Sequence, residues 1–110
     1  MNLKIRSKKK IIITASNSNI GKDLVSYFLK KKYNIFGTYR NKKNLFKKPY
    51  ITYLNYEFKN NFLVKENFDM LIHCASLTPY KYKISNKIMN LNYIGFKKIL
   101  KSKSNFKKII

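Results

Sequence analysis

Residues 11–29 read IIITASNSNIGKDLVSYFL, and this stretch decides the fold. The β-branched run at residues 10–14 is typical of a buried strand, and the polar residues 16–19 are typical of a turn. From Ile20 onward, apolar residues recur at helical spacing with lysines between them. A strand, a polar turn and a helix in this order can bind phosphate, because the free N–H groups at a helix start attract anions. The question is which kind of phosphate-binding turn this stretch forms.

Strand-like and helix-like patterns alternate along the rest of the chain. We expect further strands at residues 34–40, 50–56, 68–76 and 106–110, a short helix within residues 59–67, and a long amphipathic helix over residues 84–102. Strands that alternate with helices imply parallel pairing and right-handed crossovers. The sequence therefore predicts an α/β fold with one parallel sheet of about five strands flanked by helices.

Composition narrows the class of protein. Hydrophobic residues make up 45% of the 110 residues, so the chain is globular rather than disordered, and its length suits one small domain. No apolar run approaches the length of a membrane span, and no signal peptide follows the basic start. The single cysteine excludes an intramolecular disulfide and favours a cytoplasmic setting, and the single histidine excludes a cluster of histidine metal ligands.

The formal net charge of +21 raises the alternative of a nucleic-acid-binding module. Nearly all of the positive charge is lysine, since arginine occurs only at Arg6 and Arg40, and arginine is the better reader of phosphates and bases. The lysines are spread along the chain. Lysine, asparagine, isoleucine, tyrosine and phenylalanine all have A/T-rich codons, so a biased base composition explains their abundance together. We therefore expect no specific nucleic-acid partner.

Two phosphate-binding patterns fit the opening stretch in part. The P-loop pattern G-x-x-x-x-G-K-[ST] matches Gly21 and Lys22, but Ser16 stands at its first glycine and Asp23 at its Mg²⁺-binding hydroxyl. The acidic Asp69 precedes an apolar run instead of ending one. A P-loop nucleotide hydrolase is therefore the weaker interpretation.

The second pattern is the dinucleotide-binding T-G-x-x-G-x-x-G, in the frame that ends at Gly21. Ala15 replaces its first glycine and Ser18 its second. Gly21 keeps the role of close packing between helix and strand, and Ala15 adds only a methyl group if its φ is negative. The Ser18 hydroxyl and the side-chain amides of Asn17 and Asn19 could donate to phosphate. The alternative is a plain polar turn with Asn19 near the helix N-cap.

The predicted second strand ends in Arg40, nineteen residues after Gly21. In a dinucleotide-binding domain, an acid at this place reads the ribose of NAD, and a basic residue accommodates the 2′-phosphate of NADP. Arg40 therefore favours NADP over NAD, with an exposed strand-end charge as the alternative.

Four segments together resemble the N-terminal half of an extended short-chain dehydrogenase/reductase, of the NAD-dependent epimerase/dehydratase family. They are IIITASNSNIG (11–21), GTYR (37–40), FDMLIHCAS (68–76) and NYIGFKKIL (92–100). They are similar, in order, to the T-G-x-x-G-x-x-G turn, the end of strand two, the D-x-V-I-H-x-A-A strand and the N-x-x-G-T helix of that family. FKKII (106–110) then resembles the start of strand five. The resemblance implies a Rossmann-like sheet in the order 3-2-1-4-5, formed by residues 10–110 after a basic extension of residues 1–9.

The resemblance also implies a cofactor-binding role for a set of residues beside the carboxyl ends of the strands. The implied positions are Ala15, Ser18, Asn19, Ile20 and Gly21 at the pyrophosphate, Arg40 at the adenosine 2′-phosphate, Glu57 and Phe58 beside the adenine, Cys74, Ala75 and Ser76 along the ribose and nicotinamide, and Asn92 as a brace of the fourth strand. The alternative for His73 is a satisfied core residue, and for Cys74 it is a small buried hydrophobe.

The family's chemistry needs a Ser/Thr after strand five and a Tyr-x-x-x-Lys on the next helix. Neither is matched here, and we interpret the three internal Tyr-x-x-x-Lys spacings, Tyr27/Lys31, Tyr39/Lys43 and Tyr93/Lys97, as chance. We expect a chain without catalytic residues that is inactive alone, as a truncated, split or degenerate form. It would be the NAD(P)-binding part of an oxidoreductase or a sugar-nucleotide epimerase/dehydratase, whose nucleotide-sugar substrate needs a further part. Exposed apolar surface would then favour self-association.

Overall fold

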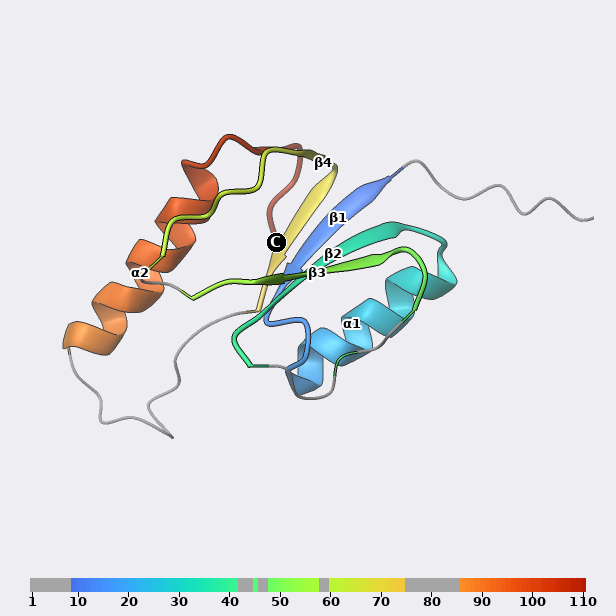
Figure 1. Cartoon of the computed structure of the whole chain (residues 1–110), viewed down its shortest axis with the longest axis horizontal. Helices are drawn as coiled ribbons and strands as arrows, with labels where there is room; N and C mark the ends of the chain where they lie inside the picture. The colour runs from blue at the N-terminus through green and yellow to red at the C-terminus, as the bar shows by residue number, and fades with distance from the viewer. Residues whose placement is uncertain (1–8, 42–44, 46–47, 58–59, 75–85) are drawn as a thin grey trace, which may run out of the picture.

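The computed structural model describes residues 9–41, 45, 48–57, 60–74 and 86–110, and for residues 86–92 it describes the helix without the side chains. The described part of the chain forms strands and helices, which Figure 1 shows in space. They are β1 (Lys10–Thr14), α1 (Asn19–Lys30), β2 (Asn34–Tyr39), β3 (Ile51–Asn55), β4 (Asn67–Phe68), β5 (Met70–His73), α2 (Asn86–Leu100) and β6 (Asn105–Phe106).

β1 is the centre of the main sheet. Its four residues from Ile11 to Thr14 are completely buried, as expected for a β-branched run enclosed on both faces. Ile12 pairs with Phe36 of β2 on one side and with Leu71 of β5 on the other, both in parallel. With β3 beside β2, the strand order is β3-β2-β1-β5, which confirms the predicted parallel α/β sheet.

The predicted fourth strand, residues 68–76, is interrupted at Asp69. β4 precedes this residue and pairs with β6, whereas β5 follows it and pairs with β1. The Asp69 N–H donates to the Lys10 carbonyl at 2.7 Å, and the Asp69 carboxylate accepts the Lys10 N–H at 2.8 Å. The side chain of Asp69 thus replaces a backbone acceptor, and the strand breaks there.

The last segment of the chain runs beside the broken strand, where the predicted order 3-2-1-4-5 puts the fifth strand. The Lys107 N–H donates to the Phe68 carbonyl at 3.0 Å, and the Ile110 N–H donates to the Leu71 carbonyl at 2.8 Å. The regular part, β6, is only two residues long, and Ile109 adds a parallel bridge to Leu71.

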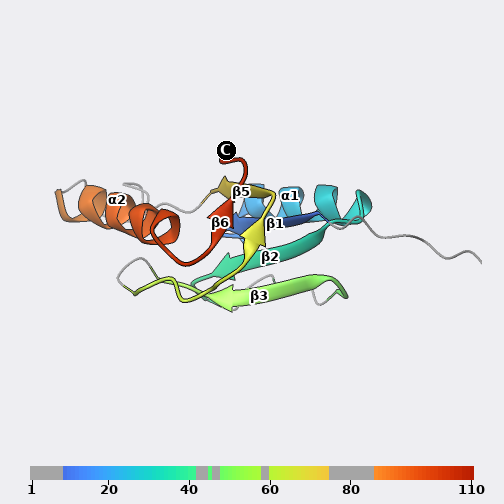
Figure 2. The same ribbon diagram turned by 90° about the horizontal axis from the view of Figure 1, so that it is seen from above.

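The sheet lies between two helices (Figures 1 and 2). Side chains of a strand alternate between its faces, so Ile11 and Ile13 pack with Val25 of α1, whereas Ile12 packs with Ile99 of α2. The two cores are therefore built from opposite faces of β1.

The two ends of α1 are well defined. Ser18 is the N-cap, and its Oγ accepts the Gly21 N–H at 3.0 Å. At the other end, the Lys32 N–H donates to Leu29 O at 2.9 Å and the Tyr33 N–H to Phe28 O at 3.1 Å, which is a Schellman motif. Lys32 has a φ of 64°, so lysine occupies a left-handed position that usually holds glycine.

The short helix expected within residues 59–67 is wrong for the part that the structure describes. Residues 60–66 form neither helix nor strand. Phe62 is buried against Tyr56, with ring centroids 5.2 Å apart, while Leu63 is 88% exposed. Ser104 donates to Val64 O at 2.6 Å and accepts the Glu66 N–H at 3.1 Å. The Val64 carbonyl and the Glu66 N–H are therefore hydrogen-bonded without a helix.

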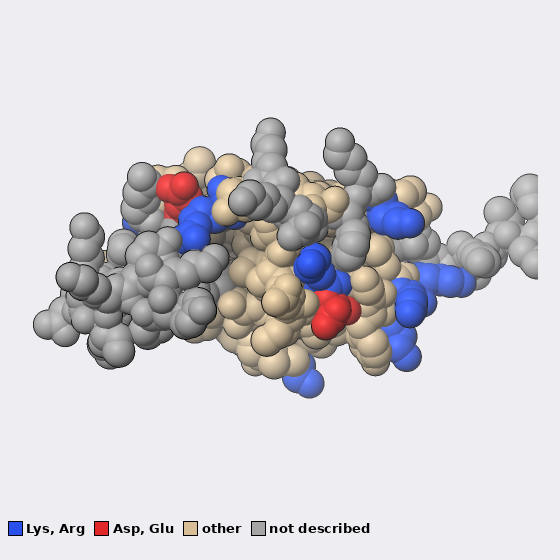
Figure 3. All heavy atoms as spheres, turned by 90° about the horizontal axis from the view of Figure 1, so that it is seen from below, with Lys and Arg blue, Asp and Glu red and all other residues tan. Residues whose placement is uncertain are grey.

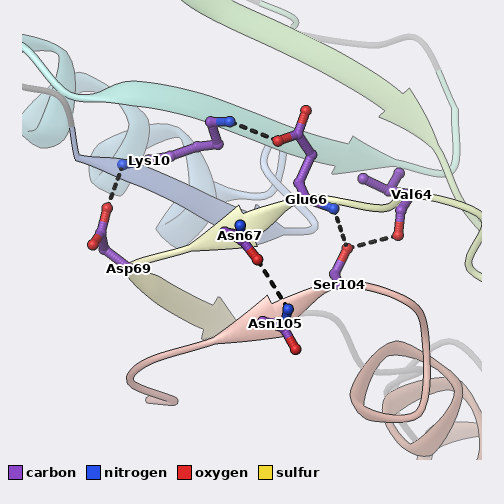
Figure 4. A network of polar contacts seen from close by, with 7 residues as sticks. All are labelled: Lys10, Val64, Glu66, Asn67, Asp69, Ser104 and Asn105. Atoms are coloured by element: carbon purple, nitrogen blue, oxygen red, sulfur yellow. Dashed lines mark hydrogen bonds and ion pairs between the residues drawn. The ribbon is translucent and has the colours of Figure 1, made fainter.

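Figure 4 shows the polar contacts that hold this segment to the amino end of β1. The Lys10 Nζ lies 2.6 Å from Oε2 of Glu66, and both side chains are about one-third exposed. The Lys107 Nζ lies 3.5 Å from Oδ1 of Asp69. Two of the four acidic residues of the chain are therefore engaged by lysines at the amino edge of the sheet.

Within the described part of the chain, no helix combines the length and the apolar character that crossing a membrane requires.

Candidate functional site

The carboxyl ends of β1, β2, β3 and β5 lie at the same edge of the sheet, because all four strands are parallel (Figure 1). Ligands of open α/β sheets bind outside this edge. The turn of residues 15–18, Arg40, Glu57 and Cys74 all follow these strand ends. The fold thus brings four segments of the predicted site to one edge.

The turn after β1 begins with a left-handed residue. Ala15 has a φ of 49°, so the condition of a negative φ is not met. Glycine adopts this conformation at no steric cost, whereas alanine pays for its Cβ. Position 15 is the place of the first glycine in the dinucleotide-binding pattern, and the backbone keeps the geometry that this glycine serves.

The turn is tied to the end of β2. The Ser16 N–H and Oγ both donate to Thr38 O, at 2.8 and 2.9 Å, and the Ala15 N–H donates to Thr38 Oγ1 at 3.1 Å. The Asn17 side-chain amide donates to Asn41 O at 2.7 Å. The amide of Asn17, expected as a phosphate donor, therefore holds the two strand ends together. The pattern did not indicate the roles of Ser16 and Thr38.

Gly21 brings α1 against the turn. A Cβ at this position would clash with the Ala15 carbonyl oxygen and would lie 2.9 Å from the Ser16 Cα. The sequence pattern predicted close packing of the helix on the strand at Gly21, whereas the close contact in the structure is with the turn. A Cβ at Gly37 of β2 would meet the Ser16 side chain at 2.7 Å, a second close approach that the sequence pattern did not indicate.

Ser18 caps the helix, and its hydroxyl proton is used within the turn. Oγ donates to Ala15 O at 2.7 Å while it accepts the Gly21 N–H. The expectation that this hydroxyl donates to phosphate is therefore wrong for this conformation. The alternative that placed Asn19 near the N-cap agrees with the structure, because Asn19 is the first helical residue and directly follows the N-cap Ser18.

Two backbone donors remain at the start of α1. The N–H groups of Asn19 and Ile20 have no acceptor among the described residues. Both residues are exposed, Ile20 to 67%, and the first turn contains no acidic side chain. The helix dipole adds partial positive charge at this end. The start of α1 therefore provides two N–H groups in a field that favours an anion.

Arg40 is exposed directly after β2. The described residues offer its guanidinium neither a hydrogen bond nor an ion pair. Its neighbour Asn41 is bonded to Asn17 of the turn, so the backbone places Arg40 beside the same loop as the start of α1. The geometry suits contact with a ligand and equally suits a solvated charge.

At the end of β3, Tyr56 is buried and Glu57 is half-buried. The Tyr56 hydroxyl donates to the Gly95 carbonyl of α2 at 2.9 Å, and burial raises the pKa of this hydroxyl. Tyr56 thus joins this strand end to α2. Phe58, the second expected adenine neighbour, lies outside the described residues.

At the end of β5, Thr14 joins two strands. Its Oγ1 accepts the Cys74 N–H at 2.8 Å and lies 3.0 Å from Nδ1 of His73. The His73 ring packs on Phe96 of α2, with ring centroids 4.4 Å apart. Burial lowers the pKa of His73 and raises that of Cys74, so both side chains are uncharged at neutral pH. His73 has the contacts of a satisfied core residue.

Three expected site positions lie beyond what the structure describes. Ala75 and Ser76 fall outside the described residues, and for Asn92 only the helical backbone is described. Their roles stay predictions.

Two of the internal Tyr-x-x-x-Lys spacings are surface pairs. Tyr27 is 54% exposed with Lys31 Nζ 5.5 Å from its ring centroid, and Tyr93 is 65% exposed with Lys97 Nζ at 5.6 Å. Both are cation–π contacts across one helical turn. Neither pair lies on a helix that follows the last strand, and Lys43 of the third spacing is outside the described residues.

The P-loop interpretation loses support from the position of Asp69. This residue lies at the amino end of β5, where it pairs with Lys10, whereas the turn of residues 15–18 lies at the carboxyl edge. No group of three or more metal-binding side chains occurs among the residues that the structure describes.

Solved structures with the same fold are known. A short chain dehydrogenase from Leptospira borgpetersenii with bound NAD⁺ matches with a TM-score of 0.65 and 18% identity over 90% of this chain and 47% of that one. The enzyme WbmH from Bordetella bronchiseptica, in complex with NAD⁺, gives a TM-score of 0.64 and 16% identity over 84% of this chain and 34% of that one. A variant of ElxO with NADPH bound gives a TM-score of 0.60 and 19% identity over 86% of this chain and 50% of that one.

The fold is Rossmann-like. At these identities the likeness concerns the fold alone, and the chain spans half or less of the length of these three structures. No family model matches the sequence, and a search of curated proteins finds no match.

Proposed function

We propose that the chain is the NAD(P)-binding part of an oxidoreductase or a sugar-nucleotide epimerase/dehydratase of the short-chain dehydrogenase/reductase kind. The observation that carries this proposal is the pair of free N–H groups, those of Asn19 and Ile20, at the start of α1. They lie at the carboxyl edge of a parallel sheet, after a turn that starts in the left-handed conformation. The ligands bound in solved structures with the same fold, NAD⁺ and NADPH, support the choice of a dinucleotide.

The residues present fit a pyrophosphate. Two backbone donors and a helix dipole can receive its charge, and Lys22 adds a cation in the first turn while no acid opposes it there. In this proposal the turn of Ala15 and Ser18 shapes the site, and Gly21 lets the helix approach. A nicotinamide dinucleotide would supply hydride transfer, and this part of the chain would bind and orient it.

The test is a substitution that removes a donor without harming the helix. Asn19 is the first helical residue, where proline is well tolerated, and Ser18 has φ −72° and ψ 168°, which suits a residue before proline. Asn19→Pro removes the backbone N–H of residue 19, whereas Asn19→Ala removes the side-chain amide and keeps this N–H. We expect NADPH affinity, measured by calorimetry, to fall about tenfold in the proline variant relative to the alanine variant. Equal affinities at unchanged melting temperature would refute the role of this helix start.

The preference for NADP rests on Arg40. In this proposal its guanidinium contacts the adenosine 2′-phosphate, with Glu57 and Phe58 beside the adenine and Cys74, Ala75 and Ser76 along the ribose and nicotinamide. Arg40→Ala should weaken NADPH about tenfold and leave NADH nearly unchanged. The matched control is Lys101→Ala, which removes one exposed charge just beyond α2. If NADPH and NADH weaken equally in the Arg40 variant, the assignment of Arg40 is wrong.

The substrate and the reaction stay proposals of class only. In this proposal a nucleotide-sugar substrate would need a further part of the protein, and catalysis is assigned to no residue of this chain. We also keep the prediction that the chain alone is inactive and that exposed apolar side chains, such as Leu63 and Ile110, favour self-association.

A further inference from the structure

Lysines and tyrosines gather where α1 ends, on the side of the sheet opposite the candidate dinucleotide site. We call this surface the α1-end patch, and it consists of Lys9, Tyr27, Lys30, Lys31, Lys32 and Tyr33. It joins the last turns of α1 to the starts of β1 and β2, since the Asn34 N–H donates to the Lys9 carbonyl at 3.0 Å. Figure 3 shows basic side chains gathered toward the side on which α1 ends, with others scattered over the rest of that face.

Aromatic rings and ammonium groups alternate within the patch. The rings of Tyr27 and Phe28 have centroids 5.0 Å apart, and those of Phe28 and Tyr33 are 5.2 Å apart. Lys31 Nζ lies 5.5 Å from the Tyr27 centroid, and Lys9 Nζ lies 5.6 Å from the Tyr33 centroid. The patch therefore holds its rings in place through Phe28 and holds two cations beside them.

The left-handed backbone at Lys32 is strained, and the amino-acid composition of the chain does not explain why a lysine occupies this position. With a φ of 64°, this lysine occupies the position at which a Schellman motif prefers glycine. A/T-rich codons disfavour glycine, but they also provide asparagine, which tolerates the left-handed conformation several-fold better than lysine. The chain is rich in asparagine, so a less strained residue was available. Strained residues of this kind mark functional sites more often than other places.

We propose that the α1-end patch binds single-stranded nucleic acid without sequence preference. Lysines would contact phosphates, and the exposed face of Tyr27, which is 54% exposed, would stack on an unpaired base. An anionic membrane fits less well, because the exposed aliphatic side chains among the described residues, Ile20, Leu63, Ile94, Leu100, Ile109 and Ile110, lie outside the patch. The inference does not depend on dinucleotide binding, because the two surfaces lie at opposite edges of the sheet.

Because a chain with a net charge of +21 binds any polyanion to some degree, the test compares equal changes of charge. The patch variant replaces Lys30, Lys31 and Lys32 by glutamine, and the control variant replaces Lys101, Lys103 and Lys108, which are exposed near the end of α2 and beyond it. The probe is a fluorescent oligouridylate of about twelve nucleotides, followed by anisotropy at several salt concentrations. We expect the patch variant to lose about tenfold in affinity at about 150 mM salt and to lower the salt slope by about two, with a much smaller loss in the control.

Two single substitutions separate binding from folding. Lys32→Gly removes a positive charge and also relieves the left-handed backbone, so it should raise the melting temperature while it weakens oligouridylate binding. Tyr27→Leu should weaken binding at least about fivefold, whereas Tyr93→Leu, which removes an equally exposed tyrosine from the same kind of lysine pair on α2, should not. Equal losses in patch and control variants, equal affinity for a duplex of the same length, or tighter binding to phosphatidylserine vesicles would each overturn the proposal.

Discussion

The hydroxyl oxygen of Thr14 lies 3.0 Å from Nδ1 of His73 and accepts the backbone N–H of Cys74 at 2.8 Å. This contact joins the carboxyl ends of β1 and β5, two neighbouring strands whose following segments form part of the candidate site. Thr14 is completely buried, so its hydroxyl has a structural role. The contribution of Thr14 to the free energy of unfolding, and the change of that free energy with pH through His73, can both be measured.

Stability should fall in mild acid because of His73. Burial lowers the pKa of His73 below its ordinary value of 6.5, so the unfolded chain binds more protons than the folded one just below that pH. The free energy of unfolding should therefore be constant between about pH 7 and 8 and decrease as the pH falls through 6.5 toward the folded-state pKa. Urea unfolding at several pH values measures it.

The control for this prediction is unusually clean, because His73 is the only histidine of the chain. His73→Asn keeps a polar side chain beside Thr14 and does not titrate. The variant should show a flat stability between about pH 5.5 and 7.5. A wild-type slope that persists in this variant would assign the effect to another group. Asp69, whose pKa is lowered first by its bond to the Lys10 N–H, should lose its contribution only when the pH falls below about 4.

Thr14→Val should destabilise the fold by about 1 kcal/mol, because it leaves the partly buried Cys74 N–H without its acceptor at similar side-chain volume. Thr14→Ser keeps the hydroxyl and should retain most of this contribution. The difference between the two midpoints in urea is the measurement. Equal losses would mean that the methyl group of Thr14, and not its hydroxyl, stabilises this strand end.

Ala15→Gly should preserve or raise stability by up to about 1 kcal/mol, because glycine adopts the φ of 49° without a Cβ penalty. The matched control is Ser26→Gly within α1, which should lower stability by roughly 0.5 kcal/mol through the helix propensity of glycine. Thermal melts of both variants compare them directly. A loss of stability in the Ala15 variant as large as in the Ser26 variant would contradict the left-handed turn.

Gly21→Ala should be the most damaging small substitution in the turn. The new Cβ would clash with backbone atoms of Ala15 and Ser16, which cannot move aside, and overpacking of this kind costs about 1–3 kcal/mol. A Cβ in Gly37→Ala would lie 2.7 Å from the Ser16 Cβ and 3.2 Å from Tyr53 Cδ1. These are side-chain atoms, and the closest contact is longer than the closest backbone contact of Gly21→Ala, so the cost of Gly37→Ala should be smaller. Unfolding free energies in urea rank the two, and the opposite ranking would refute the close approach of α1 to the turn.

The sequence predicted the elements whose side-chain pattern indicates one kind of burial, such as a strand buried on both faces or a helix buried on one face. The apolar runs of β1 and β5 and the amphipathic pattern of α1 predicted these elements and their burial, because a strand buried on both faces must be apolar throughout. The order of the strands was predicted only from the family resemblance. The prediction of a helix within residues 59–67 was wrong for the described residues. The Val64 carbonyl and the Glu66 N–H bond to Ser104, which is far away in the sequence, and no local pattern reveals such a contact. The interruption of the fourth strand at Asp69 was not predicted for the same reason, because it involves a bond between the Asp69 carboxylate and the distant Lys10 N–H.

The candidate site was predictable in position but not in the use of its side chains. The pattern located the turn and Gly21, yet Ser18 and Asn17 use their polar groups within the protein. A sequence cannot tell a hydroxyl that donates to a ligand from one that caps a helix, since the same residue types suit both. The positive φ of Ala15 could have been expected from the glycine that the pattern places there.

The proposed function requires that this edge of the sheet bind a nicotinamide dinucleotide, and a calorimetric titration of the chain with NADPH measures this binding. The titration should be done at about 150 mM salt, to suppress attraction by the net charge alone, and repeated with inorganic pyrophosphate at the same concentration as NADPH. The account predicts one saturable site per chain that keeps NADPH when pyrophosphate is present and that weakens in the Asn19→Pro variant. Binding that does not saturate, or that pyrophosphate abolishes at equal concentration, would contradict it.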